Sequence, residues 1–333
     1  MGTELANINY TADKQTIVVS VVIVNFNGLR FLRSCLDSII VALQGISHEI
    51  IVVDNASVDG SCDFLAAEFA HVRLIQSYEN LGFTGGNNLG AKNALGQFLL
   101  LLNNDTECKS HLGSLIDCLS DPAVGAAGCL LKYGDGRLQL SVGYEHTPSR
   151  IVLSWLGLSR FFKHLTIFSR VQTDLAFYAQ KQENLAWVSG ACLLTRADIW
   201  HQLNGLDEQF FMYCEDVDYC RRVRGLGFRV VFDPYSEVTH YEGAGKAWIG
   251  ELALMRTARS CLLYTDKHFG RPSRFFVGTL LGSIFLARFL AYSIMYLTAV
   301  KNIVISQKIR AYGRAGIYLI TRGLGLQGFE AKI

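Results

Sequence analysis

Two groups of acidic residues carry the side chains best suited to chemistry in this chain. Asp105 follows an apolar run at residues 99–102 and two asparagines, and a second group, Glu-Asp-Val-Asp, lies at 215–218. A carboxylate flanked by amides suits a hard divalent cation that is shared with a diphosphate. The alternative is that Asp105 only caps a helix expected near Ser110. The second acidic group favours the metal-site interpretation.

The elements that position Asp105 are apolar runs that each end on a polar residue or glycine. The pattern predicts strands over residues 17–24, 49–53, 72–76 and 98–102, and helices over 29–43 and 59–69. Such alternation is typical of a mostly parallel sheet with helices on both faces. Because parallel strands point the same way, their polar ends meet at one edge, where open α/β folds bind ligands. We therefore expect an α/β fold with its site along this edge.

The second half of the chain is less regular. The pattern predicts strands over 124–132, 187–195 and 228–232, helices over 197–203 and 215–224, and a turn at 233–234 before His240. Residues 145–184 have no clear period and carry many basic and aromatic side chains. We interpret them as a mobile loop over the site.

Composition and charge limit the classes of protein that fit. A chain of 333 residues suits one large α/β domain plus an appendage, and a net charge of +2 argues against a nucleic-acid partner. The nine cysteines form no CxxC pair, which favours reduced thiols over disulfides or a zinc site. Residues 1–16 are a polar tail without the apolar core of a signal peptide. We therefore expect catalysis on the cytoplasmic side.

Motifs in a fixed order resemble those of glycosyltransferase family 2, particularly its bacterial rhamnosyltransferase-like branch. They lie at residues 21–28 (VVIVNFNG), 52–61 (VVDNASVDGS), 79–90 (ENLGFTGGNNLG), 101–105 (LLNND), 187–199 (WVSGACLLTRADI) and 205–228 (GLDEQFFMYCEDVDYCRRVRGLGF), followed by His240. The resemblance covers about residues 18–242. It implies a GT-A fold and inverting transfer of a sugar from a nucleotide diphospho-sugar, with Mg²⁺ or Mn²⁺.

The resemblance and the composition together divide the chain into three regions. These are the polar tail (1–16), the glycosyltransferase domain (17–245) and a helical, apolar C-terminal region (246–333). Within the domain, residues 17–110 are the nucleotide-binding half and residues 111–245 the acceptor half.

The resemblance assigns the metal and the nucleotide to the strand ends of the first half. Asp105 takes the last position of a DxD-like motif whose first position is Asn103 here, which weakens metal binding. Asp54 takes the position that binds the base and ribose; the alternative is that it caps the turn at residues 56–57. The other implied nucleotide-site residues are Asn25, Asn27, Gly28, Asn80, Gly82, Gly86, Asn87 and Asn104. A plain surface loop explains the glycines nearly as well.

Inverting transfer needs one carboxylate that takes the proton of the acceptor hydroxyl. By family position this base is Asp216, with Glu215 as the substitute, and two adjacent charges would raise one pKa. The alternative is an acidic first helical turn in which Asp218 pairs with Arg221 or Arg222. That alternative leaves the aromatic run upstream, residues 210–213, unexplained.

His240 and the segment that begins at Trp187 complete the implied site. The matching histidine of the family reaches the metal or the diphosphate, although a lone histidine is more often structural. Trp187, Ser189 and Gly190 match the acceptor-side strand of the family, where an aromatic ring stacks on a sugar. The alternative for Trp187 is packing in the core.

The C-terminal region contains an apolar segment of 26 residues, 275–300, that is interrupted by Arg288. A helix of this length spans roughly 39 Å, but a central arginine costs roughly 2.5–3.5 kcal/mol in a membrane span. Basic residues flank the segment on both sides: Lys267, Arg271 and Arg274 before it, and Lys301, Lys308, Arg310 and Arg314 after it. We expect an in-plane helix or hairpin on an anionic membrane surface. A packing or dimerisation helix, and hence a homo-oligomer, is the alternative.

The resemblance favours a glycosyltransferase of bacterial surface polysaccharide synthesis. The expected donor is dTDP-rhamnose, with galactofuranose or hexose donors as alternatives, and the expected acceptor is a glycan or polyprenyl-linked glycan. A nucleotidyltransferase would need a glycine-rich, lysine-bearing loop after the first strand, which residues 25–32 (NFNGLRFL) do not supply. A binding protein without activity is disfavoured because Asp105, Asp216 and His240 are all present.

Overall fold

The computed structural model describes residues 17–162, 165–241, 250–298 and 303–326, so the polar tail at 1–16 lies outside the described residues. The strands are β1 Val19–Asn25, β2 His48–Asn55, β3 Arg73–Ser77, β4 Phe98–Asn103, β5 Thr106–Cys108, β6 Val124–Tyr133, β7 Leu138–Gln139, β8 Val142–Gly143, β9 Trp187–Val188, β10 Cys192–Arg196 and β11 Arg229–His240. The helices are α1 Leu29–Ala42, α2 Ser61–Glu68, α3 Gly82–Lys92, α4 Gly113–Asp117, α5 Pro148–Ser154, α6 Ala197–Gln202, α7 Glu215–Gly225, α8 Gly250–Thr298 and α9 Ile303–Gly323. Short 3₁₀ turns lie at Cys118–Ser120, Leu158–Arg160, Thr166–Phe168 and Leu175–Ala179.

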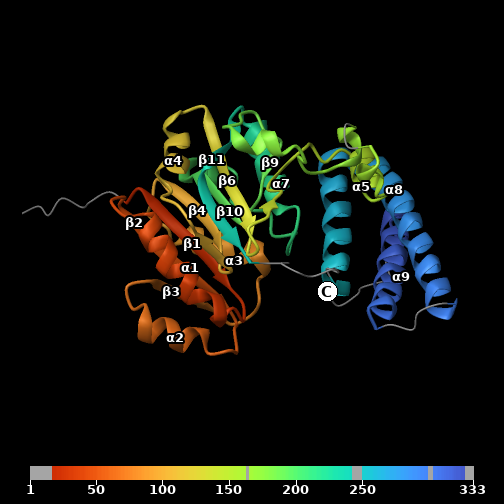
Figure 1. The fold of residues 1–333 in the computed structure, drawn as a ribbon, viewed down its shortest axis with the longest axis horizontal. Coiled ribbons are helices and arrows are strands. Elements are labelled where there is room, and N and C mark those ends of the chain that lie inside the picture. The colour runs from red at the N-terminus through yellow and green to blue at the C-terminus, as the bar shows by residue number, and fades with distance from the viewer. Residues whose placement is uncertain (1–16, 163–164, 242–249, 299–302, 327–333) are drawn as a thin grey trace, which may run out of the picture.

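A nine-stranded mixed sheet forms the centre of the described chain (Figure 1). Its order is β3-β2-β1-β4-β10-β6-β11-β5, with β7 beside β6. Strands β1 to β4 are parallel, as the alternating apolar runs predicted. Strand β10 runs antiparallel between β4 and β6. The predicted α/β sheet is therefore confirmed, with one reversed strand near its centre.

Each face of the sheet has its own hydrophobic core, and helices cover both. Leu32, Leu36 and Ile39 of α1 are fully buried on one face, where α2 and α4 also pack. Trp200 of α6 and Val223 of α7 are buried on the other face, together with α3. The second core continues into α8 and α9, so the C-terminal helices pack on the same side as α7.

Helix α3 lies unusually close to the sheet because it carries glycines where it meets β1. A Cβ atom at Gly86 would lie 2.7 Å from Cγ1 of Val24, and one at Gly90 would lie 2.4 Å from Cγ1 of Val22. A side chain at either position would push the helix away from the strand. These glycines therefore set how near the start of α3 comes to the carboxyl edge of the sheet.

Two predicted strands differ in the structure. The run predicted as one strand over 187–195 is broken at residues 189–191 into β9 and β10. The strand predicted over 228–232 continues to His240, because the residues after Asp233 form a register shift and not the predicted turn. The Asp233 carboxylate accepts hydrogen bonds from Ser236 N–H (3.1 Å) and the Ser114 hydroxyl (2.9 Å), which hold this irregularity. His240 is thus the last residue of a strand.

Within the interpreted loop 145–184, the described part contains more structure than predicted. It includes α5 and three 3₁₀ turns, and α5 packs against α8. The Trp155 ring, just after α5, meets the Phe285 ring of α8 edge-on at 4.9 Å between centroids. This segment therefore joins the sheet domain to the C-terminal helices.

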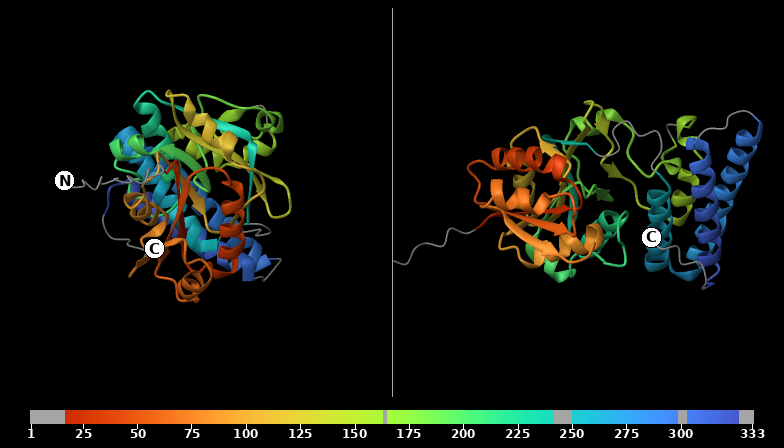
Figure 2. Two further views of the ribbon diagram at one scale, coloured as in Figure 1. Left: turned by 90° about the vertical axis from the view of Figure 1, so that its left-hand side faces the viewer. Right: turned by 90° about the horizontal axis from the view of Figure 1, so that it is seen from below.

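Helix α8 has a sharp kink at Gly270, which has φ 78° and ψ 177° and precedes Pro272 by two residues. The part before the kink, cyan in Figure 1, lies between the sheet and the hairpin formed by the rest of α8 and α9. Figure 2 shows this hairpin at the end of the molecule opposite the β2–β3 edge. The helical C-terminal appendage is therefore confirmed.

Glycines let the two arms of the hairpin approach closely. A Cβ at Gly278 would lie 2.6 Å from Cα of Gly323, and one at Gly282 would lie 2.9 Å from the carbonyl oxygen of Gly316. Arg288 donates to the Tyr312 hydroxyl at 3.3 Å and to the Trp155 carbonyl, so the charge inside the apolar segment has protein partners. Among the described helices, α8 alone is long and apolar enough to cross a membrane, by length and composition only.

Candidate active site

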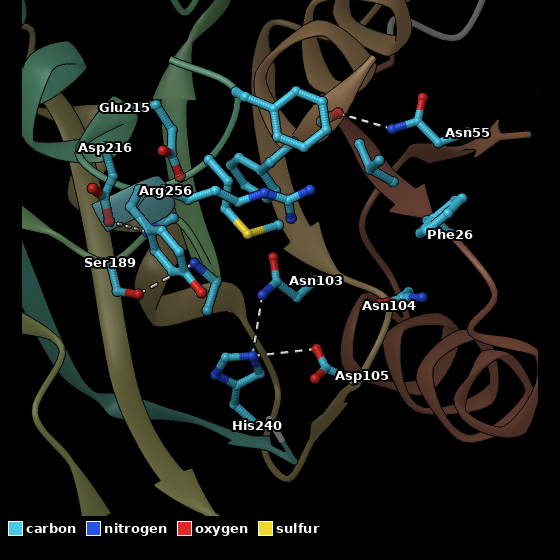
Figure 3. Close-up of a pocket in the computed structure, with 18 of the residues that line it drawn as sticks. Phe26, Asn55, Asn103, Asn104, Asp105, Ser189, Glu215, Asp216, His240 and Arg256 are labelled. Atoms are coloured by element: carbon cyan, nitrogen blue, oxygen red, sulfur yellow. Dashed lines mark hydrogen bonds and ion pairs between the residues drawn. The ribbon is translucent and has the colours of Figure 1, made fainter. Parts of the chain in front are cut away.

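A cavity of about 460 Å³ opens at the carboxyl edge of the sheet, between its two halves (Figure 3). The cavity brings together predicted nucleotide, metal, acceptor and catalytic residues: Asn80, Gly82, Asn104, Asp105, Ser189, Gly190, Glu215, Asp216 and His240. Residues from the first half come from strand ends and the start of α3, and those from the second half come from the β9–β10 break and the start of α7. The sheet therefore gathers segments more than 130 residues apart around one cavity.

The ends of β4 and β11 bring a carboxylate and an imidazole together. Asp105 Oδ1 lies 3.2 Å from Nε2 of His240, and the Asn103 amide nitrogen lies 3.1 Å from the same atom. On the other side of the ring, Nδ1 lies 3.0 Å from Oε1 of Gln139. When Nδ1 carries the proton and donates a hydrogen bond to Gln139, Nε2 keeps a lone pair that faces Asp105. Metal-binding histidines are supported by a second residue in the same way.

These groups fit part of a cation site. The described residues contain no group of three His, Cys, Asp or Glu side chains arranged to hold a metal ion. Asp105 and His240 supply two converging ligand atoms, and a hard cation takes its remaining ligands from water or phosphate oxygens. The donor set therefore suits a metal that is held jointly by the protein and a diphosphate.

Asp216 sits at the start of α7 and is fixed by backbone hydrogen bonds. Its carboxylate accepts from Gly190 N–H at 3.0 Å and from its neighbour Val217 N–H at 2.8 Å. The first bond explains the break between β9 and β10, because Gly190 turns its N–H out of the strand toward α7. Burial raises the pKa of Asp216 although both N–H groups favour its charged form.

Glu215, beside Asp216, has a different environment. Its side chain is 7% exposed, and Oε2 has no hydrogen-bond partner among the described residues. Burial and the charge of Asp216 raise the pKa of Glu215 well above its usual range. Tyr213 and Cys214 just before it both have positive φ, 72° and 65°. Such backbone is costly for residues with a side chain and is typical of functional sites.

Asn25, Gly28 and Asp54 support the cavity from behind and do not line it. Asp54 accepts from the Asn25 amide (3.1 Å) and from Ser57 N–H (2.9 Å), the turn-capping bond that was the alternative for this residue. Asn25 in turn accepts from the Asn104 amide at 2.7 Å. A Cβ at Gly28 would lie 2.0 Å from that amide nitrogen. These residues therefore position Asn104, which does line the cavity.

Four other predicted residues do not line the cavity. Asn27 is exposed and binds the turn at Ser57, and Asn87 donates to the Phe83 carbonyl within α3. Gly86 packs against β1, as described above. Trp187 is 8% exposed and donates from its indole to the Tyr144 carbonyl at 3.1 Å, which agrees with the core-packing alternative.

The structure adds lining residues that the sequence interpretation did not select. They are Val24, Phe26, Asn55, Phe83, Gln139, Ala191, Phe211, Met212, Tyr213, Leu252 and Arg256. The aromatic run at 210–213 could have indicated some of these residues, because residues 211–213 line the cavity. Leu252 and Arg256 come from α8, beyond the matched motifs, and no spacing in the sequence connects them with the acidic residues.

Comparison with known proteins identifies the family. Residues 16–256 match the family described as glycosyltransferase like family 2. The chain is 29% identical, over 77% of its length and 86% of the relative's, to the N-acetylglucosaminyl-diphospho-decaprenol L-rhamnosyltransferase of Mycobacterium tuberculosis. It is 27% identical, over 65% of its length, to the O-antigen biosynthesis protein RfbC of Myxococcus xanthus.

The matches cover only part of some relatives. The chain spans only 25% and 16% of the length of the first two relatives it matches, RfbC being the second.

Among solved structures, the mannosyltransferase PcManGT from Pyrobaculum calidifontis has a TM-score of 0.54 at 15% identity, covering 92% of this chain and 86% of that one. This structural likeness shows the GT-A fold. Because the family match covers more than two thirds of the chain, the protein belongs to glycosyltransferase-like family 2.

Proposed function

We propose that this protein transfers a sugar, with inversion, from a nucleotide diphospho-sugar to a lipid-linked glycan during bacterial surface polysaccharide synthesis. The observation that carries the proposal is one cavity lined by Asp216, held by Gly190 N–H, together with Asp105 and His240. A base on one side and a cation site on the other are the two parts that a single displacement at an anomeric carbon requires.

The reaction follows from these positions. The acceptor oxygen forms a bond to the anomeric carbon as the bond from that carbon to the diphosphate oxygen breaks. The acceptor proton passes to the Asp216 carboxylate, and the nucleoside diphosphate leaves with the electron pair. One attack from the far side inverts the anomeric centre, and no second, nucleophilic carboxylate is needed. Glu215 holds its proton and offers a hydrogen bond to a sugar hydroxyl.

Asp105 and His240 would hold a divalent cation, Mg²⁺ or Mn²⁺. A bound cation neutralises the charge that develops on the departing diphosphate. Support comes from the two converging ligand atoms and from PcManGT, whose structure is titled as a complex with GDP-Man and Mn²⁺. Gln139, on the Nδ1 side, orients the imidazole so that Nε2 faces Asp105.

The donor and the acceptor follow from the relatives. The mycobacterial relative is named for rhamnose transfer to N-acetylglucosaminyl-diphospho-decaprenol, which supports dTDP-rhamnose and a polyprenyl-linked acceptor here. A lipid-linked acceptor presents its hydroxyl near the membrane, and the hairpin of α8 and α9 would hold the enzyme there, on the cytoplasmic face. Because residues 250–269 pack against the sheet domain, we propose Gly270 as its working boundary in place of residue 245.

The test is a donor assay with purified protein. dTDP-L-rhamnose, UDP-galactofuranose and UDP-hexoses are each offered with a soluble N-acetylglucosaminyl-diphospho-lipid, in Mn²⁺ or in EDTA. We expect transfer from dTDP-rhamnose with an inverted anomeric centre, lost in EDTA and in Asp105→Ala. Transfer from another sugar alone would correct the donor, and the absence of transfer and hydrolysis with every donor would contradict the proposed function.

A further inference from the structure

Arg256 brings a positive charge from the C-terminal helix into the cavity. It is the one arginine or lysine among the described residues that line the cavity, while the lining carboxylates are Asp105, Glu215 and Asp216. In Figure 3 the guanidinium of Arg256 lies within the ring of lining side chains, between Glu215 and Asn103. The carboxylates of Asp105 and Asp216 repel an anion unless cations offset their charge, so this arginine matters for any phosphate that enters.

Arg256 is half-buried, and its guanidinium forms no ion pair with the described residues. Its Nε atom is fully buried and has no hydrogen-bond partner among the described residues, and burial lowers the pKa of Arg256. The contact that holds it is the Phe211 ring, whose centroid lies 4.5 Å from the guanidinium carbon. A cation over an aromatic ring gains about 0.5–2 kcal/mol, less than the cost of leaving a buried charged donor unpaired. Arg256 therefore still needs a hydrogen-bond acceptor, and a molecule that enters the cavity would supply one.

The Phe211 ring under Arg256 belongs to a segment that contacts the nucleotide-binding half. The Phe211 carbonyl accepts Phe83 N–H at 3.0 Å at the start of α3. The Gly82 carbonyl of the same turn accepts from the Asn55 amide at 2.8 Å. A Cβ at Gly82 would lie 2.5 Å from the Phe211 carbonyl oxygen, so the two segments are in direct contact. Phe211 thus holds the guanidinium beside the strand ends that receive the nucleotide.

We propose that Arg256 binds the diphosphate of the sugar donor and stays with the nucleoside diphosphate as it leaves. This inference rests on the proposed function. Arginine suits the task because its planar donors match phosphate oxygens and its charge is permanent. The start of α8 is then part of the donor site, which explains why it packs into the sheet domain while the hairpin after Gly270 does not. The acceptor's own diphosphate is the other source of the same chemistry, and the experiment separates the two.

The experiment measures binding of dTDP, UDP and their free nucleosides to the full-length protein by calorimetry, in Mn²⁺. Arg256→Gln should weaken binding of the preferred nucleoside diphosphate by about 10- to 100-fold, as for loss of a charge-assisted hydrogen bond. Binding of the free nucleoside should not change. Arg256→Lys should recover part of the loss. Arg259→Gln, an exposed arginine three residues further along the same helix, is the matched control and should bind like the wild type.

Each outcome decides the inference. Unchanged affinity for the nucleoside diphosphate in an Arg256→Gln protein with a wild-type melting temperature would overturn it. If, in addition, KM rises only for acceptors that carry a diphosphate and not for an alkyl glycoside, the arginine serves the acceptor. If Arg256→Gln unfolds, the Arg256→Lys protein decides by the same ratio of nucleoside diphosphate to nucleoside binding. A wild-type protein that binds no nucleoside diphosphate contradicts the proposed function itself, and the inference with it.

Discussion

Asp216 and Glu215 are neighbours in sequence whose carboxylates differ in their hydrogen bonds. Asp216 accepts two backbone N–H groups, which favour its charged form, while Oε2 of Glu215 accepts none. When two carboxylates share a buried site, the one with fewer donors keeps the proton. Asp216 is therefore the carboxylate suited to be the base, and Glu215 the one suited to donate.

The acid limb of the profile of kcat against pH should reflect the ionisation of Asp216 beside Glu215. Burial raises the pKa of Asp216, so kcat should fall, as pH decreases, at a pH above the usual aspartate value of about 3.9. Glu215→Gln replaces a protonated side chain with a neutral one and should leave that limb in place. The measurement is kcat against pH for both proteins. A limb that moves to lower pH in Glu215→Gln would mean that Glu215 is ionised in the working enzyme.

At single residues the sequence predicted which acidic and imidazole side chains meet better than how they are supported. Asp105, His240, Glu215 and Asp216 line one cavity, because β4 and β11 end and α7 begins at the same edge of the sheet. Asp54 has a turn-capping bond that local spacing also suggested. The contact behind the cavity that positions Asn104 depends on the orientation of the Asn25 side chain, which the spacing of residues does not determine.

Among the elements, α7 and α8 are joined by one buried carboxylate. Asp218 is fully buried and lies 2.7 Å from each of three partners: Arg222 of its own helix, and Lys267 and His268 of α8. Burial opposes the charged form of Asp218, but the hydrogen bond from His268 and the charges of Arg222 and Lys267 lower its pKa to about 2. The helix that carries the base is thereby fixed to the helix that carries Arg256.

Asp218→Asn should destabilise the protein by about 2–3 kcal/mol at neutral pH, the free energy that corresponds to the fall of the Asp218 pKa to about 2. Because the folded pKa is depressed, this stability is fully present above the unfolded pKa of about 3.9 and is lost as pH falls through 2. The difference in free energy of unfolding between wild type and variant should therefore shrink below pH 4. Denaturant titrations at pH 7, 4 and 3 measure it. A difference that stays constant down to pH 3 would contradict the linkage.

Periodicity predicted most elements, and the exceptions have tertiary causes. The apolar strands and amphipathic helices of the first half lie close to where their patterns placed them, because burial on one or both faces determines those patterns. The break at 189–191 depends on the bond from Gly190 to Asp216, which lies 26 residues away. The continuation of β11 past Pro234 depends on the bond that Asp233 accepts from the Ser114 hydroxyl, 119 residues away. Neither partner is visible in the local sequence.

At the scale of the whole molecule, the hairpin of α8 and α9 leaves large apolar side chains exposed. On the described residues these include Phe275, Phe276, Leu280, Leu290, Ile294, Leu297, Ile303 and Ile317. Arg288 is held by Tyr312 and Trp155, so its charge need not face lipid. The hairpin therefore offers an apolar surface for a membrane without exposing the central arginine.

The full-length protein should float with anionic liposomes at low salt, because apolar side chains and flanking basic residues both favour the lipid surface. The double variant Phe275→Ser/Phe276→Ser should float less. Arg33→Gln, on the far helix α1, is the control and should behave like the wild type. Full-length protein that remains at the bottom of the gradient would leave the hairpin as a packing element.

The role of residues 250–269 could not be predicted from sequence. The sequence analysis assigned them to the same C-terminal region as the segment after Gly270, but the kink separates a helix that enters the active-site cavity from a helix that does not. Only the folded chain shows that Leu252 and Arg256 reach a cavity built from strand ends. The sequence thus predicted one C-terminal appendage, and the structure divides it at Gly270 into two parts.

The rate of sugar transfer by Asp216→Asn tests the central claim most directly. Asparagine keeps the size of the side chain and removes the base, so single-turnover transfer at saturating donor should fall by about 10²- to 10⁴-fold. The dissociation constant of the nucleotide sugar should not change, and the wild-type product should show an inverted anomeric centre by NMR. A variant that transfers within tenfold of the wild-type rate, or a product with retained configuration, would contradict the account.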